Sequence, residues 1–166
     1  MTFGAYGAPV RNRWQVPLRG VSLPVLPPGL RPFAPEDVPY LAPVMWDAYR
    51  GTPDEADVGG PEGAAREIRL TLDGEYGVFL PSASFVAEHE GRHVGAALVT
   101  IYRDLPLLAF LFVSSSHSAR GIGKGLVQAV MHVLAEQGHD TLTLAVTRRN
   151  RRARHLYDRL GFVEVA

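Results

Sequence analysis

The sequence predicts an α/β (α+β) fold in which helices flank a central sheet with mixed strand directions. The chain has 166 residues, 46% of them hydrophobic, which is enough to bury a sizeable core in one domain. Strand-like segments are concentrated in the middle of the chain, and helical patterns stand before, between and after them. The chain is organised around residues 107–138, where an apolar strand runs through a polar, glycine-rich loop into a helix.

Residues 1–28 are rich in proline and glycine, and their hydrophobic pattern is weak. We therefore expect an N-terminal arm, followed by a single domain at residues 29–166. Residues 21–26 could add an edge strand, because proline is tolerated at the edge of a sheet. Otherwise the segment is a tail or a wrapping arm. A turn at residues 27–29 and a short strand at residues 30–33 begin the domain.

Two helices are predicted in the first half of the chain. The first is capped by Asp37 and runs to about Arg50, and Pro43 should kink or split it. Residues 51–61 are expected to form an acidic loop. A second helix follows at about residues 61–73, because its apolar residues lie on one face.

The later elements are bounded by glycine and turn signals, and their hydrophobic period distinguishes strands from helices. The strand at residues 107–113 is apolar throughout, which is typical of a strand buried on both faces. In chain order the elements are strands at residues 84–88, 93–100 and 107–113, a helix from the glycines to residue 138, a strand at 141–146, a helix at about 151–160 and a strand at 162–165.

The composition excludes several classes of site and partner. The formal net charge is zero, so no global field favours nucleic acid or a membrane surface. The chain has no cysteine, which excludes a disulfide framework, a thiolate zinc site and a cysteine nucleophile. No signal peptide or long apolar run is evident, and we expect a cytoplasmic protein without a metal site.

Charge is nevertheless divided between the two halves of the chain. Residues 31–92 hold 12 acidic and 5 basic residues, whereas residues 103–166 hold 5 acidic and 9 basic residues. A basic half would suit an anion and an acidic half a cation, but solvated faces explain the division equally well.

Three alternate glycines, Gly121, Gly123 and Gly125, stand at the start of the helix that follows the buried strand. Glycine lets a ligand approach the backbone closely, and a helix start offers unpaired N–H groups and a partial positive charge. We therefore expect a cradle for the pyrophosphate of a coenzyme. A P-loop is excluded because Ser118 and Gly125 replace required residues, and a dinucleotide fingerprint is weakened by Leu126.

Two motifs carry a resemblance to a known family. The glycine loop resembles the coenzyme A loop of the GCN5-related N-acetyltransferases (the GNAT family), whose pattern is Arg/Gln-x-x-Gly-x-Gly/Ala after an apolar strand. Gly121 and Gly123 match its glycines, Val113 lies at the usual distance, and Ser118 stands in place of its first residue. The family's second motif, Asn-x-x-Ala-x-x-Leu-Tyr-x-x-x-Gly-Phe, is reproduced without a gap by Asn150, Ala153, Leu156, Tyr157, Gly161 and Phe162.

The resemblance covers the chain from about residue 30 and implies a GNAT-like, mostly antiparallel sheet in which two strands splay apart at the coenzyme site. It implies an acetyl-CoA-dependent N-acetyltransferase that transfers the acetyl group to a primary amine by direct attack. Tyr157 would be the catalytic residue that gives the departing thiolate a proton or a hydrogen bond. A free main-chain N–H near Val113 would polarise the thioester carbonyl. The implied coenzyme-binding residues are Phe112, Val113, Ser118, Ala119, Arg120, Gly121, Ile122, Gly123, Lys124, Asn150, Ala153 and Tyr157.

The group that accepts the proton of the amine is left open. A strand glutamate often serves in the family, but residues 107–113 contain none. The acidic loop near Asp54 lies where the family usually builds the acceptor pocket, and it could attract a cationic amine. The candidates are Asp54, Glu55, Asp57, Glu75, Glu88 or a water chain.

The acceptor and the partners are also open. The amine could belong to a small molecule or to a protein, and the chain could act as a monomer or a homodimer. A non-catalytic acyl-CoA-binding sensor or scaffold would fit the missing glutamate. An arginine cluster could contact coenzyme phosphates or an acidic partner, and the absence of an aromatic stacking pattern argues against nucleic acid. Its members are Arg148, Arg149, Arg151, Arg152, Arg154 and Arg159.

Overall fold

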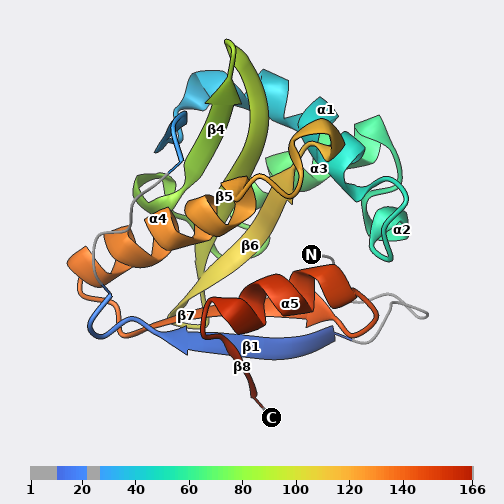
Figure 1. The fold of residues 1–166 in the computed structure, drawn as a ribbon. Coiled ribbons are helices and arrows are strands. Elements are labelled where there is room, and N and C mark those ends of the chain that lie inside the picture. Colours follow the sequence, from blue (N-terminus) through green and yellow to red (C-terminus); the bar gives the residue numbers. More distant parts are fainter. Residues whose placement is uncertain (1–10, 22–26, 166) are drawn as a thin grey trace.

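One mixed sheet forms the centre of the structure, a computed structural model that describes residues 11–21 and 27–165 (Figure 1). Its eight strands are β1 (Arg11–Pro17), β2 (Leu30–Pro32), β3 (Val78–Phe79), β4 (Phe85–His89), β5 (Arg92–Tyr102), β6 (Leu105–Val113), β7 (Thr141–Thr147) and β8 (Val163–Val165). Their order is β2-β4-β5-β6-β7-β1-β8, with β3 paired to β5. All pairs are antiparallel except β6 and β7, which run parallel. The predicted α/β class with a mostly antiparallel sheet is confirmed.

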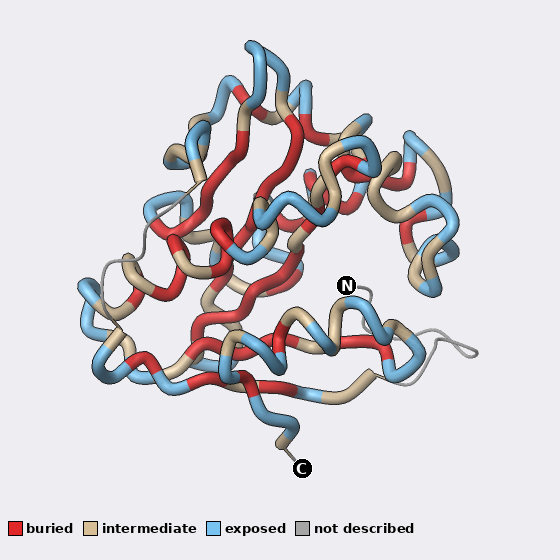
Figure 2. Tube along the Cα trace, viewed as in Figure 1, coloured by how far each residue is buried: buried red, intermediate tan, exposed pale blue. Residues whose placement is uncertain are grey.

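Helices cover both faces of this sheet. They are α1 (Val38–Tyr49), α2 (Glu55–Val58), α3 (Pro61–Leu72), α4 (Ile122–Glu136) and α5 (Arg151–Arg159). The helices α4 and α5 share one core with β1 and β7, and α1 and α3 share a second core on the opposite face (Figure 1). Figure 2 shows the buried residues concentrated along the strands between these two layers. No helix in the described part of the chain is long and apolar enough to cross a membrane.

Strand β6 contributes to both cores, which confirms that it is buried on both faces. Leu108 belongs to the core under α4, whereas Phe110 and Phe112 belong to the core under α1 and α3. The register against β5 shifts at Leu98, so that Ala109 is an extra residue in β6. Such a bulge bends a strand and increases its local twist, and β6 is the strand that leaves its neighbour at the site described below.

Two tight hairpins join β4 to β5 and β5 to β6. Glu90 and Gly91 have φ values of 51° and 75°, and Arg103 and Asp104 have φ values of 51° and 67°. Two-residue hairpin loops favour this left-handed conformation because it matches the twist of the strands. The first turn lies between the strands predicted at residues 84–88 and 93–100, whereas β6 begins at Leu105, two residues before the predicted start at residue 107.

Strand β1 lies inside the sheet, between β7 and β8. Its register pairs Trp14 with Leu144 in β7 and with Glu164 in β8. The prediction of an arm missed this strand, because proline and glycine dominate the composition around residues 11–17 and obscure their alternation. The edge strand predicted at residues 21–26 falls almost wholly outside the described residues.

The first helices differ from prediction in three respects. Helix α1 is continuous although Pro43 lies inside it; Pro43 is exposed, so the carbonyl that loses its partner can bond to water. The Asp37 side chain does not cap α1 but accepts from the backbone N–H of Ala34, 2.8 Å away. Residues 55–58, expected as loop, form the short helix α2.

Candidate active site

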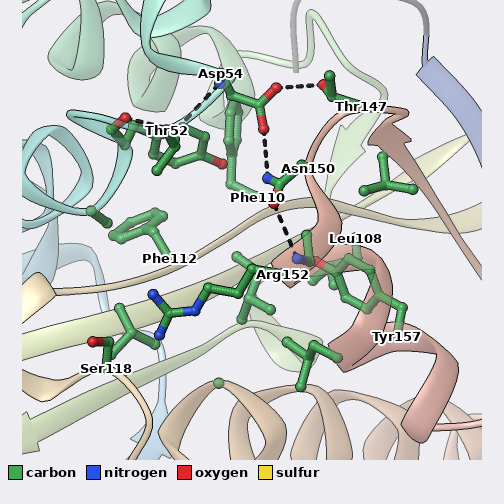
Figure 3. A pocket seen from close by; sticks show the side chains of 18 of the residues that line it. Thr52, Asp54, Leu108, Phe110, Phe112, Ser118, Thr147, Asn150, Arg152 and Tyr157 are labelled. Atoms are coloured by element: carbon green, nitrogen blue, oxygen red, sulfur yellow. Dashed lines mark hydrogen bonds between the residues drawn. The ribbon is translucent and has the colours of Figure 1, made fainter.

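A cavity of about 820 Å³ opens where β6 and β7 separate (Figure 3). Its walls come from β6, β7, the segment from the end of α1 to α2, the N-terminal turn of α4 and one side of α5. The fold therefore brings the glycine loop, the asparagine–tyrosine motif and the acidic loop to one place.

The separation of β6 and β7 creates the central part of this cavity. The two strands share one register pair, Leu107 with Thr143, and the Thr143 hydroxyl donates to the Pro106 carbonyl over 2.7 Å. Beyond this pair the strands diverge, and the cavity is lined by residues 108–113 on one side and 145–147 on the other. The expected splay is present, and it turns one edge of β6 toward the cavity instead of toward a neighbouring strand.

The N-terminus of α4 forms one end of the cavity. Gly121 is its N-cap residue with φ +78°, and Ala119 is also left-handed with φ +63°. No side chain in the described part of the chain caps this helix, so its first N–H groups have no side-chain acceptor there and can bind a ligand. Residues 118–119 and 121–124 line the cavity here. This geometry fits the anion cradle that the glycines predict.

The alternate glycines serve different purposes. A Cβ atom on Gly123 would meet protein atoms only at ordinary distances, 3.7 Å from Val113 and 3.8 Å from Leu156. A Cβ atom on Gly125 would lie 2.5 Å from the ring of Pro27. Gly125 is thus required for packing against the segment before β2, whereas none of the described residues requires glycine at position 123, which lines the cavity.

Helix α5 is fixed by its N-cap residue. The Asn150 side-chain oxygen accepts from the backbone N–H of Ala153 over 3.1 Å, so Asn150 caps the helix. The Asn150 amide group also donates to Asp54 over 3.0 Å (Figure 3). The cap therefore orients one side chain that connects α5 to the acidic loop.

Tyr157 lies on the cavity-facing side of α5 and is 8% exposed. Its ring packs edge-to-face on Phe162 with centroids 5.5 Å apart. Burial, and then the charge of Asp54, raise the pKa of Tyr157 well above its ordinary value. The phenol therefore stays protonated at neutral pH, so it can donate a hydrogen bond but cannot serve as a base.

Arg152 supplies a cation at the glycine-loop end of the cavity. It lines the cavity, and Figure 3 shows its side chain extending from α5 toward Ser118 on the glycine loop. Ser118 occupies the position at which the family motif has arginine or glutamine, so a positive side chain reaches this region from a different element.

Acidic side chains gather at the opposite end, near α2. Asp54 accepts from the Thr147 hydroxyl and from Asn150 (Figure 3). Asp57 forms an ion pair with Arg11 of β1. Burial, followed by the charges of Tyr157 and Asp54, raises the pKa of Tyr49 in the same wall.

The cavity gathers all the residues predicted to bind coenzyme except Arg120, which is exposed and does not line it. Among the candidate bases, Asp54 and Asp57 line the cavity, whereas Glu55, Glu75 and Glu88 do not. His117 also lines it, with its Nδ1 atom 3.0 Å from the Ser114 hydroxyl.

Sequence reasoning missed two residues that shape the site. Thr147 was passed over, although a hydroxyl residue at the end of β7, three positions before Asn150, was a usable signal. Arg11 carried no signal, because its strand was not predicted.

Comparisons with known proteins identify the family of the chain. The model of the acetyltransferase (GNAT) family matches residues 46–162. A mycothiol acetyltransferase of Acidimicrobium ferrooxidans is 32% identical over 146 residues, which cover 84% of this chain and 45% of that protein. A 5-NmdU N-acetyltransferase of Pseudomonas phage PaMx11 is 38% identical over 77 residues, or 46% of this chain and 54% of that protein. The chain thus spans about half the length of these curated relatives.

The fold has counterparts among solved structures. A GCN5-related N-acetyltransferase from Sphaerobacter thermophilus superposes with a TM-score of 0.72 at 23% identity, covering 95% of this chain and 50% of that chain. At this identity the likeness concerns the fold.

Proposed function

Because the chain belongs to the GNAT family of acetyltransferases, we propose that it transfers the acetyl group of acetyl-CoA to a primary amine. The observation that carries this proposal is the single cavity that joins an uncapped helix N-terminus, a splayed strand pair and a protonated tyrosine. Its acidic end is the place for the acceptor. The domain predicted to begin at residue 29 would include β1, which completes the sheet beside β7.

The coenzyme end would hold acetyl-CoA by charge and backbone contacts. The first N–H groups of α4 would bind the pyrophosphate, and the open space at Gly123 would allow its close approach. Arg152 would add a cationic contact that Ser118 cannot make. The pantetheine arm would lie in the gap between β6 and β7, beside Val113 and Ala153.

The proposed reaction is direct attack of the amine on the thioester. A C–N bond forms, the C–S bond breaks, and the electron pair leaves with the sulfur as a thiolate. A backbone N–H of β6 near Val113 would polarise the carbonyl oxygen. The Tyr157 hydroxyl would donate a hydrogen bond to the departing thiolate. The amine's proton would go to Asp54, Asp57 or water, since the other candidate carboxylates lie outside the cavity.

Two measurements test the proposal. Acetyl-CoA should raise the melting temperature of the protein, whereas ATP at the same concentration should not. Thiol release should then be followed with a chromogenic disulfide across a panel of primary amines; the protein contains no cysteine, so every thiol detected comes from the coenzyme. No rise in melting temperature with acetyl-CoA would contradict the proposal.

An alternative is a non-catalytic acyl-CoA sensor, because β6 has no glutamate that could accept the proton of the amine. A sensor would show the rise in melting temperature without thiol release for any amine. The same proposal includes a cytoplasmic location. It allows a small molecule or a protein as the acceptor, and a monomer or a homodimer as the working form.

A further inference from the structure

We infer that Asp54 binds the ammonium group of the acceptor, so that the site selects positively charged primary alkylamines. This inference rests on the proposed function, because it assigns the acceptor end of the same cavity.

The position of Asp54 is the first argument. It belongs to the segment between α1 and α2, yet its carboxylate reaches across to the end of β7 and the start of α5. Figure 3 shows the Asp54 side chain held between Thr147 and Asn150. Its charge acts on both Tyr49 and Tyr157, whose pKa values it raises in addition to the effect of burial. The carboxylate therefore lies within electrostatic reach of the tyrosine proposed to assist the leaving thiolate.

The hydrogen bonds around Asp54 are the second argument. Because the Asn150 oxygen is used by the Ala153 N–H, its amide nitrogen must face Asp54, and the Thr147 hydroxyl donates to the other carboxylate oxygen. Thr147 and Asn150 therefore each donate one hydrogen bond to Asp54. A carboxylate accepts about four hydrogen bonds in total, so each oxygen keeps capacity for an N–H donor of a ligand.

The lack of a counter-charge is the third argument. None of the ion pairs formed among residues 11–21 and 27–165 involves Asp54. Asp57, the neighbouring acid in the cavity, is neutralised by Arg11. Glu67, which also lines the cavity, is 4% exposed and accepts from the Tyr76 hydroxyl. A partly buried carboxylate without a cation is costly, and an ammonium ligand would remove that cost.

A purely structural role for Asp54, tying the acidic loop to α5, makes a different prediction. Asparagine can still accept at its carbonyl oxygen, so Asp54→Asn keeps part of the tie and removes the charge. The matched control is Glu55→Gln, which makes the same change of charge at the next residue, exposed and outside the cavity.

The experiment measures binding, so it does not depend on turnover. Protein saturated with coenzyme A is titrated with n-butylammonium chloride, and separately with n-butanol as the uncharged probe of similar shape, while the amide signals are followed by NMR. We expect wild type and Glu55→Gln to bind n-butylammonium at least about tenfold more tightly than n-butanol, as hydrogen bonds to a charged group imply. Asp54→Asn should lose this preference and keep its melting-temperature rise with acetyl-CoA.

A kinetic arm uses acceptors of different charge. For Asp54→Asn, KM for n-butylammonium should rise at least about tenfold more than KM for hydroxylamine, which is uncharged at neutral pH. Retention of the n-butylammonium preference by Asp54→Asn, or its absence in wild type, would overturn the inference. If acetyl-CoA fails to raise the melting temperature of the wild type, it is the proposed function that fails.

Discussion

Tyr157 shows how the surroundings of one side chain fix its chemical role. Its ring is anchored on Phe162, and burial together with the charge of Asp54 raises its pKa. A phenol of this kind is a weaker acid than a free tyrosine, so proton transfer to the thiolate is harder while hydrogen-bond donation remains available. We therefore expect Tyr157 to stabilise the leaving group mainly as a donor.

Replacing Tyr157 by phenylalanine tests this role. The ring contact with Phe162 is kept, and the lost hydrogen bond to a charged group is worth about 1.5–3 kcal/mol. We expect kcat for thiol release to fall roughly 10- to 100-fold, with the acetyl-CoA dissociation constant unchanged. The comparison is made by steady-state kinetics and calorimetry, and an unchanged kcat would contradict the role.

Asn150 makes one contact that its position in the sequence favours and one that only the fold creates. Its capping of α5 is consistent with its place directly before a helix, where asparagine is favoured. Its bond to Asp54 could not be predicted, because Asp54 lies in a separate loop and contact between the two depends on how β7 and α1 are placed in the fold.

At the scale of elements, two glycines within one turn at the N-terminus of α4 have different roles, one facing the cavity and the other packing against the protein. Gly123 faces the cavity and has room for a side chain, whereas Gly125 is pressed against Pro27 and Leu30. The glycine pattern alone could not distinguish these two purposes, since both residues stand in the same alternation.

Paired alanine substitutions distinguish them experimentally. Gly123→Ala should leave stability unchanged or raise it by up to about 1 kcal/mol, because alanine favours helix. It should also weaken acetyl-CoA binding roughly tenfold by blocking close approach of the backbone. Gly125→Ala should lower the free energy of unfolding by about 1–3 kcal/mol through overpacking. Urea unfolding and calorimetry measure both, and equal coenzyme affinity in Gly123→Ala and wild type would argue against the cradle.

Strand β1 is the element that the sequence concealed. Trp14 is 6% exposed and packs in the core shared with α4 and α5. A seven-residue strand in a proline-rich context has too few alternating positions to stand out, and its partners are distant in the chain.

Trp14→Ala measures how much this strand contributes. We expect a loss of about 3–5 kcal/mol in the free energy of unfolding, the usual cost of removing a large buried aromatic side chain. Arg13→Ala, at the exposed neighbouring position of the same strand, is the control and should change stability by less than about 0.5 kcal/mol. Chemical denaturation gives both values; a small effect of Trp14→Ala would mean that β1 adds little to the sheet.

At the scale of the whole molecule, the sequence predicted the helices and strands that follow one another in the chain. It did not predict the contacts between segments that are distant in sequence. The strand–glycine loop–α4 unit and the β7–α5–β8 unit follow from hydrophobic period and turn residues that are neighbours in sequence. Residues of both motifs also line one cavity. The junction of Asp54 with Thr147, and of Asp57 with Arg11, depends on segments that only the completed sheet brings together. Helix α2 was missed because four residues are too few to show a helical period.

An ion-pair network remote from the cavity makes stability depend on pH. Arg31 binds both oxygens of Asp37, at 3.0 and 2.6 Å, and the Nε2 atom of His93 lies 2.8 Å from Asp37. Burial by itself would raise the pKa of Asp37, but the hydrogen bonds from Arg31, His93 and Ala34 outweigh it and hold this pKa well below its usual range. The network joins β2, the start of α1 and β5.

Asp37→Asn should destabilise the protein at pH 7 by about 2 kcal/mol, less than the ~3–5 kcal/mol of a fully buried pair because Arg31 is partly exposed. Since the folded pKa is depressed, this contribution is present above the unfolded value of about 3.9 and is lost as pH falls toward the folded value. The difference between wild type and variant should therefore shrink below about pH 4. Urea unfolding at pH 7 and pH 3 checks the sign, and a constant difference would contradict it.

The place of β1 between β7 and β8 also orders events during synthesis. A ribosome releases β1 before every other strand described, and its two neighbours after all of them. The β4–β5 and β5–β6 hairpins are local and can form while the chain is still growing, but Trp14 has no strand partner until β7 and β8 emerge. Pairings of such long sequence separation form slowly, so we expect closure of this edge to be the last step of folding. Until then the nascent chain carries an unpaired apolar strand that is open to association with other chains.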